Sequence, residues 1–175
     1  MNKKKLKMLG LDAAIIAILA AVDQYTKYLA TARLKGQADI PLIKGVLHLQ
    51  YLENSGAAFG LLQEQKWFIL FTGILFLAVI LFLLFKMPED KKYNKLHILC
   101  AVVMAGAIGN MIDRVRFDYV IDFISFVLID FPVFNFADIC VTLSVIGLAI
   151  LILFVYKEED FSFLSFKQNK YREIK

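Results

Sequence analysis

The sequence predicts a mainly α-helical membrane protein with four transmembrane helices and a small β-containing cap on the extracytoplasmic side. Of its 175 residues, 59% are hydrophobic, and the mean hydropathy is +0.64, whereas soluble domains are usually about 45–50% apolar. Long apolar runs alternate with short charged segments. The basic residues lie in clusters beside these runs, which is typical of orientation in a membrane and unlike the continuous basic surface of a nucleic-acid-binding protein.

The first predicted span covers about 6–30, although Asp12, Asp23 and Lys27 lie within it. A lysine-rich start followed by an apolar run also fits a signal peptide that is removed. We favour a retained helix, because Asp12 interrupts the apolar region and apolar residues continue to Ala30.

Three further spans are predicted over about 67–85, 96–112 and 139–156, and these three segments contain no charged residue. A helix of about 20 residues crosses the roughly 30 Å hydrocarbon core of a bilayer. Trp67 suits an anchor at the interface. The length of the chain predicts a single membrane-embedded domain over 1–175.

The distribution of lysine and arginine predicts the orientation. The N-terminal segment, the 86–95 loop and the tail 157–175 hold 13 of the 20 basic residues. The positive-inside rule therefore places both termini in the cytoplasm and the connections 31–66 and 113–138 outside. Within the first connection, 46–52 partly alternates apolar and polar residues, which predicts a strand in the outer cap.

Two aspartates in the second outer connection, 113–138, are the strongest candidates for catalysis. Asp122 and Asp138 lie between the third and fourth spans, where charge next to hydrocarbon is costly and usually functional. Two carboxyl groups a few ångströms apart share one proton. The ionised group can take a proton from water, and the protonated group can donate to a substrate carbonyl. We therefore predict that this pair is catalytic.

The same spacing also fits purely structural roles. Asn135 and Asp138 have the spacing of a capping box at the start of the fourth helix. Asp122 could likewise cap a short interfacial helix beginning at Phe123. Capping does not exclude catalysis, since a helix N-terminus is a favourable place for a carboxylate.

Two other classes of function remain open at this point. A proton-coupled transporter would use Asp23, Asp122 and Asp138 as a proton relay. Such a relay needs charges spread through the depth of the membrane, whereas the polar motifs here gather at one face. A helical scaffold that binds partners in the membrane would use the same polar residues as caps.

Several other polar residues are candidates for supporting the site. Asp23 and Lys27 share a helical face and predict a structural ion pair. Asn110 and Arg114 also share a face, and Asn110 needs a partner because it lies in an apolar span. Two histidines, His48 and His97, and two cysteines, Cys100 and Cys140, show no metal-ligand spacing, so we expect no metal or cofactor.

Five motifs occur in one order along the chain: Asp23-Gln-Tyr-Thr-Lys27, Asn54-Ser-Gly-Ala-Ala-Phe59, Gly106-Ala-Ile-Gly-Asn-Met-Ile-Asp-Arg114, Val120-Ile-Asp-Phe123 and Phe134-Asn-Phe-Ala-Asp138. Together they closely resemble the motif set of the bacterial lipoprotein signal peptidases (signal peptidase II). One motif alone is weak, but five in order beside the predicted spans are highly specific. The tail after Tyr156 matches no family motif that we can place, and the identity of residues 115–121 does not indicate how the loop brings Asp122 to Asp138.

The resemblance implies an aspartic endopeptidase of the bacterial cytoplasmic membrane that works without a metal. It would remove the signal peptide of a prolipoprotein on the N-terminal side of a diacylglyceryl-modified cysteine, act as a monomer among membrane lipids, bind no nucleic acid, and be inhibited by globomycin. A short interfacial amphipathic helix, here supplied by Phe123–Ile129, would accompany a small sheet over the site. Asp122 and Asp138 match the catalytic pair, and the residues that match positions supporting the site or binding substrate are Asn54, Gly56, Asn110, Arg114, Asn135, Asp23, Lys27 and Asp113.

Overall fold

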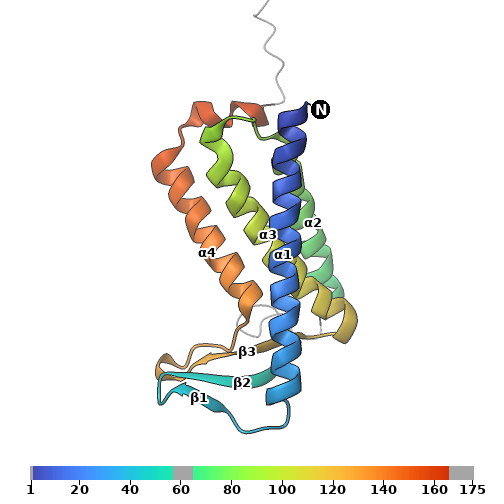
Figure 1. Cartoon of the computed structure of the whole chain (residues 1–175), viewed down its shortest axis with the longest axis vertical. Coiled ribbons are helices and arrows are strands. Elements are labelled where there is room, and N and C mark those ends of the chain that lie inside the picture. Colours follow the sequence, from blue (N-terminus) through green and yellow to red (C-terminus); the bar gives the residue numbers. More distant parts are fainter. Residues whose placement is uncertain (1, 57–64, 166–175) are drawn as a thin grey trace, which may run out of the picture.

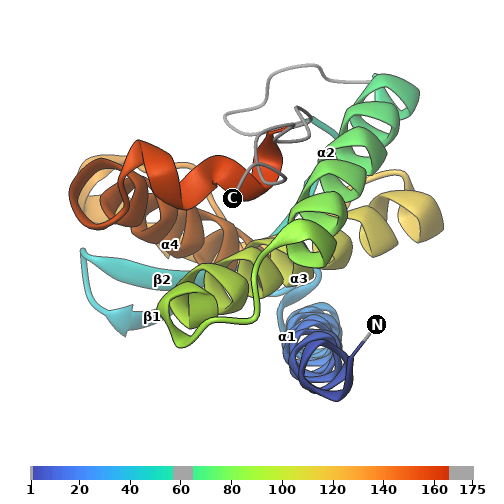
Figure 2. The ribbon, with the colours of Figure 1, turned by 90° about the horizontal axis from the view of Figure 1, so that it is seen from above.

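The computed structural model describes residues 2–56 and 65–165 of the chain. Four long helices run beside one another in this part of the chain: α1 (Lys3–Leu34), α2 (Lys66–Lys86), α3 (Asn94–Phe117) and α4 (Phe136–Ile150). A π-helical turn (Leu151–Val155) continues α4, and short 3-10 helices cover Lys91–Tyr93 and Glu158–Leu164. Seen from above, α3 lies in the middle of the bundle, with α1, α2 and α4 around it (Figures 1 and 2).

Each of the four predicted apolar segments is confirmed as a helix. The third helix continues five residues further than we predicted, to Phe117, where Asp118 ends it in the left-handed conformation at φ 71°. Asp113 and Arg114 therefore lie on the last turns of α3, and the helical face that we predicted for Asn110 and Arg114 is present. This extension matters because a helix fixes the direction of both side chains relative to Asn110.

A three-stranded antiparallel sheet lies across the end of the bundle opposite the N-terminus (Figure 1). Its order is β1 (Ile40–Ile43), β2 (Leu47–Asn54) and β3 (Val120–Phe126). Strand β2 confirms the predicted strand in the first connection. Strand β3 comes from the second connection, so the cap is built from both polar segments.

The predicted amphipathic helix over Phe123–Ile129 is wrong. Phe123–Phe126 is the second half of β3, and only Val127–Ile129 forms a single 3-10 turn. The same register rules out Asp122 as a helix cap, because Asp122 pairs with Leu52 in the middle of the ladder. The segment is rich in β-branched and aromatic residues, which favour a strand once β2 offers an edge to pair with.

Helix α1 is polar inside and apolar outside. Lys5, Asp12, Asp23 and Lys27 are among its buried residues, whereas large apolar side chains such as Leu11, Ile18 and Tyr28 are exposed. Each buried charge has a partner: Lys5 Nζ, for example, donates to the carbonyl oxygens of Leu84 and Met87 at 2.8 and 2.6 Å, and Asp12 Oδ2 lies 2.8 Å from His97 Nδ1. This pattern is the reverse of a soluble helix and is typical of a helix in a lipid environment.

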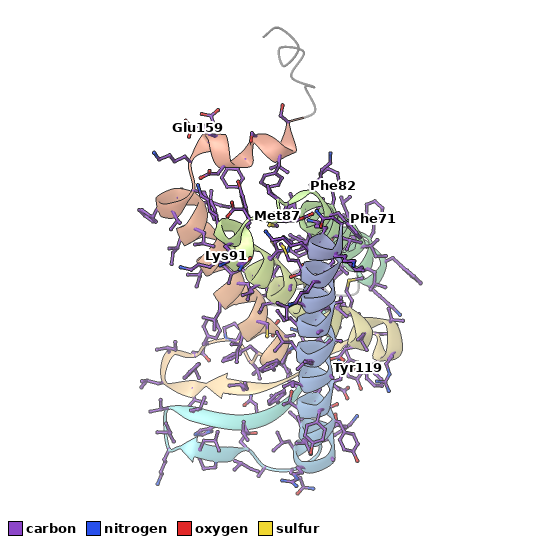
Figure 3. All side chains as sticks on the ribbon, turned by 45° about the horizontal axis from the view of Figure 1, so that its top comes forward. Phe71, Phe82, Met87, Lys91, Tyr119 and Glu159 are labelled. Atoms are coloured by element: carbon purple, nitrogen blue, oxygen red, sulfur yellow. The ribbon has the colours of Figure 1, made fainter. Side chains whose placement is uncertain are left out.

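Three helical segments of the described chain are long and apolar enough to cross a membrane: Lys66–Lys86, Lys91–Phe117 and Phe136–Val155. Helix α1 is outside this set, since its charges lie along its length. Exposed aromatic side chains cover α2, among them Phe71 and Phe82 on the outer side of the bundle (Figure 3). Exposed apolar surface of this extent belongs to a membrane protein.

Two apolar clusters leave a polar region between them. One cluster joins α2, α3 and the end of α4 around Leu84, Val103 and Leu151. The other joins the end of α1 to the sheet around Leu34 and Ile121. The predicted site residues lie between these clusters, where the helices meet the sheet.

Candidate active site

Asp122 reaches the polar region from the middle of β3. Its side chain is buried, and both carboxyl oxygens accept hydrogen bonds from asparagines of other elements. Asn54 Nδ2, at the end of β2, donates to Oδ2 at 2.9 Å, and Asn135 Nδ2, before α4, donates to Oδ1 at 2.6 Å. The alternation of a strand puts Asp122 on the face that looks toward the helices.

Asp138 lies in the first turn of α4 and belongs to a complete capping box. Asn135 Oδ1 accepts from the Asp138 amide at 3.0 Å, and Asp138 Oδ2 accepts from the Asn135 amide at 3.0 Å. The capping prediction is therefore confirmed. The other carboxyl oxygen, Oδ1, accepts from Asn110 Nδ2 of α3 at 2.8 Å, so the cap occupies only one side of the carboxyl group.

Asn135 joins the two carboxyl groups. Its side-chain nitrogen donates to Asp122 Oδ1 and also to Asn110 Oδ1 at 3.1 Å, while its side-chain oxygen caps α4. The residue is 0% exposed. Asn135 thus links Asp122 and α3 through its side-chain amide and the Asp138 carboxylate through its main-chain N–H. The orientation of the side-chain amide is determined because each of its polar atoms has a partner of one kind.

Both carboxyl groups line one cavity of about 1110 Å³. Polar groups gather at one part of its wall, and apolar groups from β3, the following turn and α4 make up much of the rest. The wall of this cavity includes Asn54, Asn110, Arg114, Asp122, Asp138 and Leu143. A cavity with a few converging polar groups in an apolar wall is the usual form of a site for an amphipathic ligand.

Burial raises the pKa of Asp122 to about 6. The hydrogen bonds from Asn54 and Asn135 oppose this shift, and the negative charge of Asp138 adds to it. Asp122 thus holds a proton more tightly than an exposed aspartate does, because its ionised form is both desolvated and close to a like charge. The two carboxyl groups therefore differ in environment, as an acid–base pair requires.

Arg114 connects the end of β2 to α3. Its Nη2 donates to the carbonyl oxygen of Gly56 at 2.7 Å, and its Nη1 donates to the carbonyl oxygen of Asn110 at 3.3 Å. The Gly56 amide in turn donates to Asn54 Oδ1 at 3.0 Å. Within the described chain, the buried Nε of Arg114 has no hydrogen-bond partner, so this guanidinium retains a donor at the wall of the cavity. Ala57–Phe59 of the same motif lie outside the described residues.

Asp23 and Lys27 form the predicted i, i+4 ion pair, but the pair is part of a larger buried group. Lys27 Nζ lies 2.9 Å from Asp23 Oδ2 and 2.9 Å from Asp113 Oδ2, and it donates to Asn110 Oδ1 at 2.8 Å. We call these four residues the Lys27 cluster. Its three charged side chains are at most 2% exposed, so our interpretation of an ordinary helix-surface pair is incomplete.

Gln24 is a site residue that the sequence analysis missed. Its Nε2 donates to Asp113 Oδ1 at 2.8 Å and to the Gly109 carbonyl oxygen at 3.2 Å. Its position next to Asp23, within the motif Asp23-Gln-Tyr-Thr-Lys27, was the sequence feature that could have identified it as a site residue. An added Cβ at Gly109 would lie 2.4 Å from Asp23 Oδ2, and one at Gly106 would lie 2.5 Å from the Ala137 carbonyl oxygen, which explains why this stretch of α3 needs glycine.

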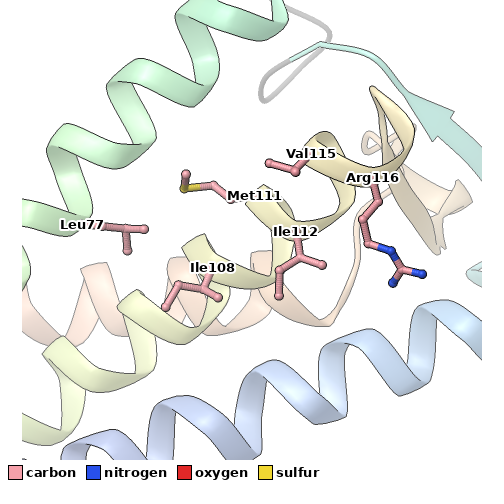
Figure 4. A pocket seen from close by; sticks show the side chains of 6 residues that line it. All are labelled: Leu77, Ile108, Met111, Ile112, Val115 and Arg116. Carbon is pink, nitrogen blue, oxygen red and sulfur yellow. The ribbon is translucent and has the colours of Figure 1, made fainter.

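A second, shallower cavity of about 300 Å³ lies between α2 and α3 (Figure 4). Its wall is apolar apart from one arginine and includes none of the predicted site residues: Leu77, Ile108, Met111, Ile112, Val115 and Arg116. Within 2–56 and 65–165, no three His, Cys, Asp or Glu side chains are arranged to hold a metal ion. The carboxyl pair is therefore the principal chemical feature of the described chain.

Lipoprotein signal peptidases from several bacteria align with most of this chain. A lipoprotein signal peptidase from Caldanaerobacter subterraneus subsp. tengcongensis is 43% identical over 141 residues, covering 80% of this chain and 94% of that protein. One from Symbiobacterium thermophilum is 44% identical, covering 79% and 90%. One from Streptococcus pyogenes serotype M5 is 36% identical over 159 residues, covering 91% and 98%.

The fold is also that of solved bacterial membrane enzymes. A structure determined by the in meso method at 2.3 Å superposes with a TM-score of 0.74 and 29% identity, covering 92% of this chain and 95% of that one. A second, at 1.9 Å, gives a TM-score of 0.72 and 30% identity, covering 84% and 95%. The family model described as signal peptidase (SPase) II matches residues 15–154, and the chain therefore belongs to the signal peptidase II family.

Proposed function

We propose that the protein is an aspartic endopeptidase that removes signal peptides from diacylglyceryl-modified prolipoproteins, cutting on the N-terminal side of the lipidated cysteine. The observation that carries this proposal is the pair of carboxyl groups, Asp122 and Asp138, that line one cavity and both accept hydrogen bonds from Asn135, one from its side chain and one from its main chain. Family membership supports the reaction class, and the geometry supports the residues.

In the proposed mechanism the pair carries one proton between its members. Asp122 holds it, in keeping with its raised pKa, and donates it to the oxygen of the scissile carbonyl. Ionised Asp138 takes a proton from the attacking water, whose oxygen bonds to the carbonyl carbon. The intermediate then breaks at its C–N bond. The leaving amine takes the proton from Asp138, and one hydroxyl group of the intermediate returns its proton to Asp122 as the carboxylic acid forms.

The surrounding polar residues would hold the reacting groups. Asn54 and Asn135 orient the Asp122 carboxyl group, and Asn110 orients that of Asp138. Arg114, which has a buried donor at the cavity wall, is suited to bind a peptide carbonyl of the substrate. Positioning of this kind can lower the activation barrier of an enzyme reaction by up to about 7–11 kcal/mol.

We infer four membrane spans in the bacterial cytoplasmic membrane, with α1 as the fourth. The exposed apolar residues of α1 and its paired, buried charges support this inference. Both termini would be cytoplasmic and the sheet extracytoplasmic. A membrane-impermeant thiol reagent should label a cysteine introduced at Lys44 in intact cells but not one introduced at Lys91; the opposite labelling would reverse the orientation.

The function is tested by incubating the purified protein with a diacylglyceryl-modified precursor. We expect release of the signal peptide, inhibition by globomycin, and no cleavage of the same precursor without its lipid. Cleavage separates the peptidase from the membrane scaffold, whereas proton-dependent flux in liposomes without cleavage would favour the transporter. The protein is expected to act as a monomer, so activity per molecule should not depend on its concentration.

The pH profile follows from the raised pKa of Asp122. Above about pH 6 Asp122 loses its proton, both carboxyl groups are ionised, and the pair lacks its acid. We therefore expect kcat/KM for a lipidated peptide to fall as pH rises through about 6, approaching a tenfold loss per pH unit. A kcat/KM that rises through this range would contradict the role of protonated Asp122 as the acid of the pair.

A further inference from the structure

Two carboxylates outside the cavity each hold the backbone just ahead of a catalytic residue. Asp113 Oδ2 accepts from the Ile121 amide at 3.2 Å, one residue before the catalytic aspartate of β3. Asp23 Oδ1 accepts from the Ala137 amide at 3.0 Å, one residue before the catalytic aspartate of α4. A shift of either carboxylate therefore shifts one member of the pair.

Lys27 joins these two carboxylates. Its ammonium group contacts Asp23, Asp113 and Asn110 at 2.9, 2.9 and 2.8 Å, so each of its three N–H donors has an acceptor. The third acceptor is the residue whose amide nitrogen donates to Asp138. As far as the described chain goes, the wall of the main cavity does not include Lys27, Asp23 or Asp113, so their effect on the reaction has to pass through other residues.

The Lys27 cluster has little room to rearrange. Gly109 brings α3 so close to α1 that a Cβ there would lie 2.4 Å from Asp23 Oδ2. Gly106 brings α3 equally close to the start of α4. Gln24 occupies the remaining acceptor of Asp113, at 2.8 Å. The cluster therefore transmits a displacement to the backbone, because neighbouring atoms leave no space to absorb it.

We propose that Lys27 is a positioning residue that sets the separation of the two catalytic carboxyl groups. This inference rests on the proposed function of Asp122 and Asp138. One ammonium group holds three anchors at once: the backbone ahead of each catalytic aspartate and the amide that orients Asp138. Without it, Asp23 and Asp113 face each other as two buried carboxylates, and their repulsion spreads the two backbone segments.

The test is Lys27→Met in the full-length protein, assayed with the lipidated precursor. We expect kcat to fall about 100-fold, as for a misplacement of about 1 Å, with KM within about twofold of wild type. Loss of the Lys27 charge by itself raises the pKa of Asp122, whereas a more distant Asp138 raises that pKa less. A decline of kcat/KM at lower pH than in wild type is therefore the result expected from a wider carboxyl pair.

Lys35→Met is the matched control. It makes the same substitution at the end of the same helix, but the Lys35–Glu53 ion pair is exposed, at 54% and 38%. Exposed pairs contribute little, so kcat, KM and the pH profile should match wild type. A purely structural role of Lys27 would lower Tm but leave kcat per folded molecule unchanged, and the decline of kcat/KM would then move only to higher pH, through loss of the Lys27 charge.

A folded Lys27→Met variant with wild-type kcat and pH profile would overturn the inference, as would a raised KM with unchanged kcat, which indicates direct substrate contact. If this variant does not fold, Asp23→Asn decides, because it keeps an oxygen for the Ala137 amide and loses the ion pair to Lys27 together with a 3.2 Å hydrogen bond from Gln24 Nε2. Lower kcat with a shifted pH profile supports the inference, and wild-type behaviour overturns it. Activity retained in Asp122→Asn would instead refute the catalytic pair itself.

Discussion

Asp122→Asn and Asp138→Asn are each expected to lower kcat for a lipidated precursor by about a thousandfold or more, since each removes one member of a pair that acts as a unit. An amide can neither take the proton from water nor supply it to the carbonyl oxygen. The volume of the side chain is unchanged, so we expect both variants to fold. Single-turnover cleavage and Tm in detergent measure the two effects separately.

Asp118→Asn is the control for both variants. It makes the same change at the C-terminal end of α3, where the side chain is 75% exposed and paired with Lys66. Its backbone is left-handed, at φ 71°, which asparagine tolerates. We expect wild-type cleavage from this control. Wild-type cleavage from a folded Asp122→Asn or Asp138→Asn protein would remove that residue from the mechanism.

A series at Asn135 separates the cap of α4 from the bridge between the carboxyl groups. Serine is as good an N-cap as asparagine, but its short side chain cannot donate to Asp122 across the site. We expect Asn135→Ser to keep Tm within a few degrees and to lower kcat about 10- to 100-fold, because the carboxyl group of Asp122 loses a 2.6 Å hydrogen bond.

Asn135→Ala removes both functions of the residue. Its kcat should fall by the same factor as that of the serine variant. Its free energy of unfolding should also fall by about 1 kcal/mol, because the helix cap is missing. Thermal unfolding and cleavage of the lipidated precursor, measured on both variants, give the comparison. If serine restored full kcat, Asn135 would be a cap alone, and the link between the two carboxyl groups would have no catalytic role.

Strand β3 illustrates where sequence reasoning failed. The amphipathic helix expected over Phe123–Ile129 came from a family pattern, and 115–121 offered no motif against which to check it. The segment forms a strand because β2 provides a partner: Leu49 pairs with Ile124 and Leu52 with Asp122. Such pairing joins residues about 70 positions apart, and no local pattern encodes it.

The Lys27 cluster illustrates a different limit. The i, i+4 spacing of Asp23 and Lys27 predicted an ion pair, and the pair is present at 2.9 Å. Spacing cannot tell whether such a pair faces water or a neighbouring helix. Asp113 and the close approach at Gly109 turn it into a buried group, and this burial gives the pair its proposed effect on the site.

The sequence by itself determined the membrane class, the four helices, the strand β2 and the residues that we propose for the chemistry, because apolar run length, charge clustering and motif identity are local properties. Only the tertiary structure decided which of these residues meet. Asp23 bonds to an amide 114 positions away and Asn54 to a carboxyl group 68 positions away. Contacts at such separations depend on how helices and strands pack around one another, and packing is a property of the whole chain.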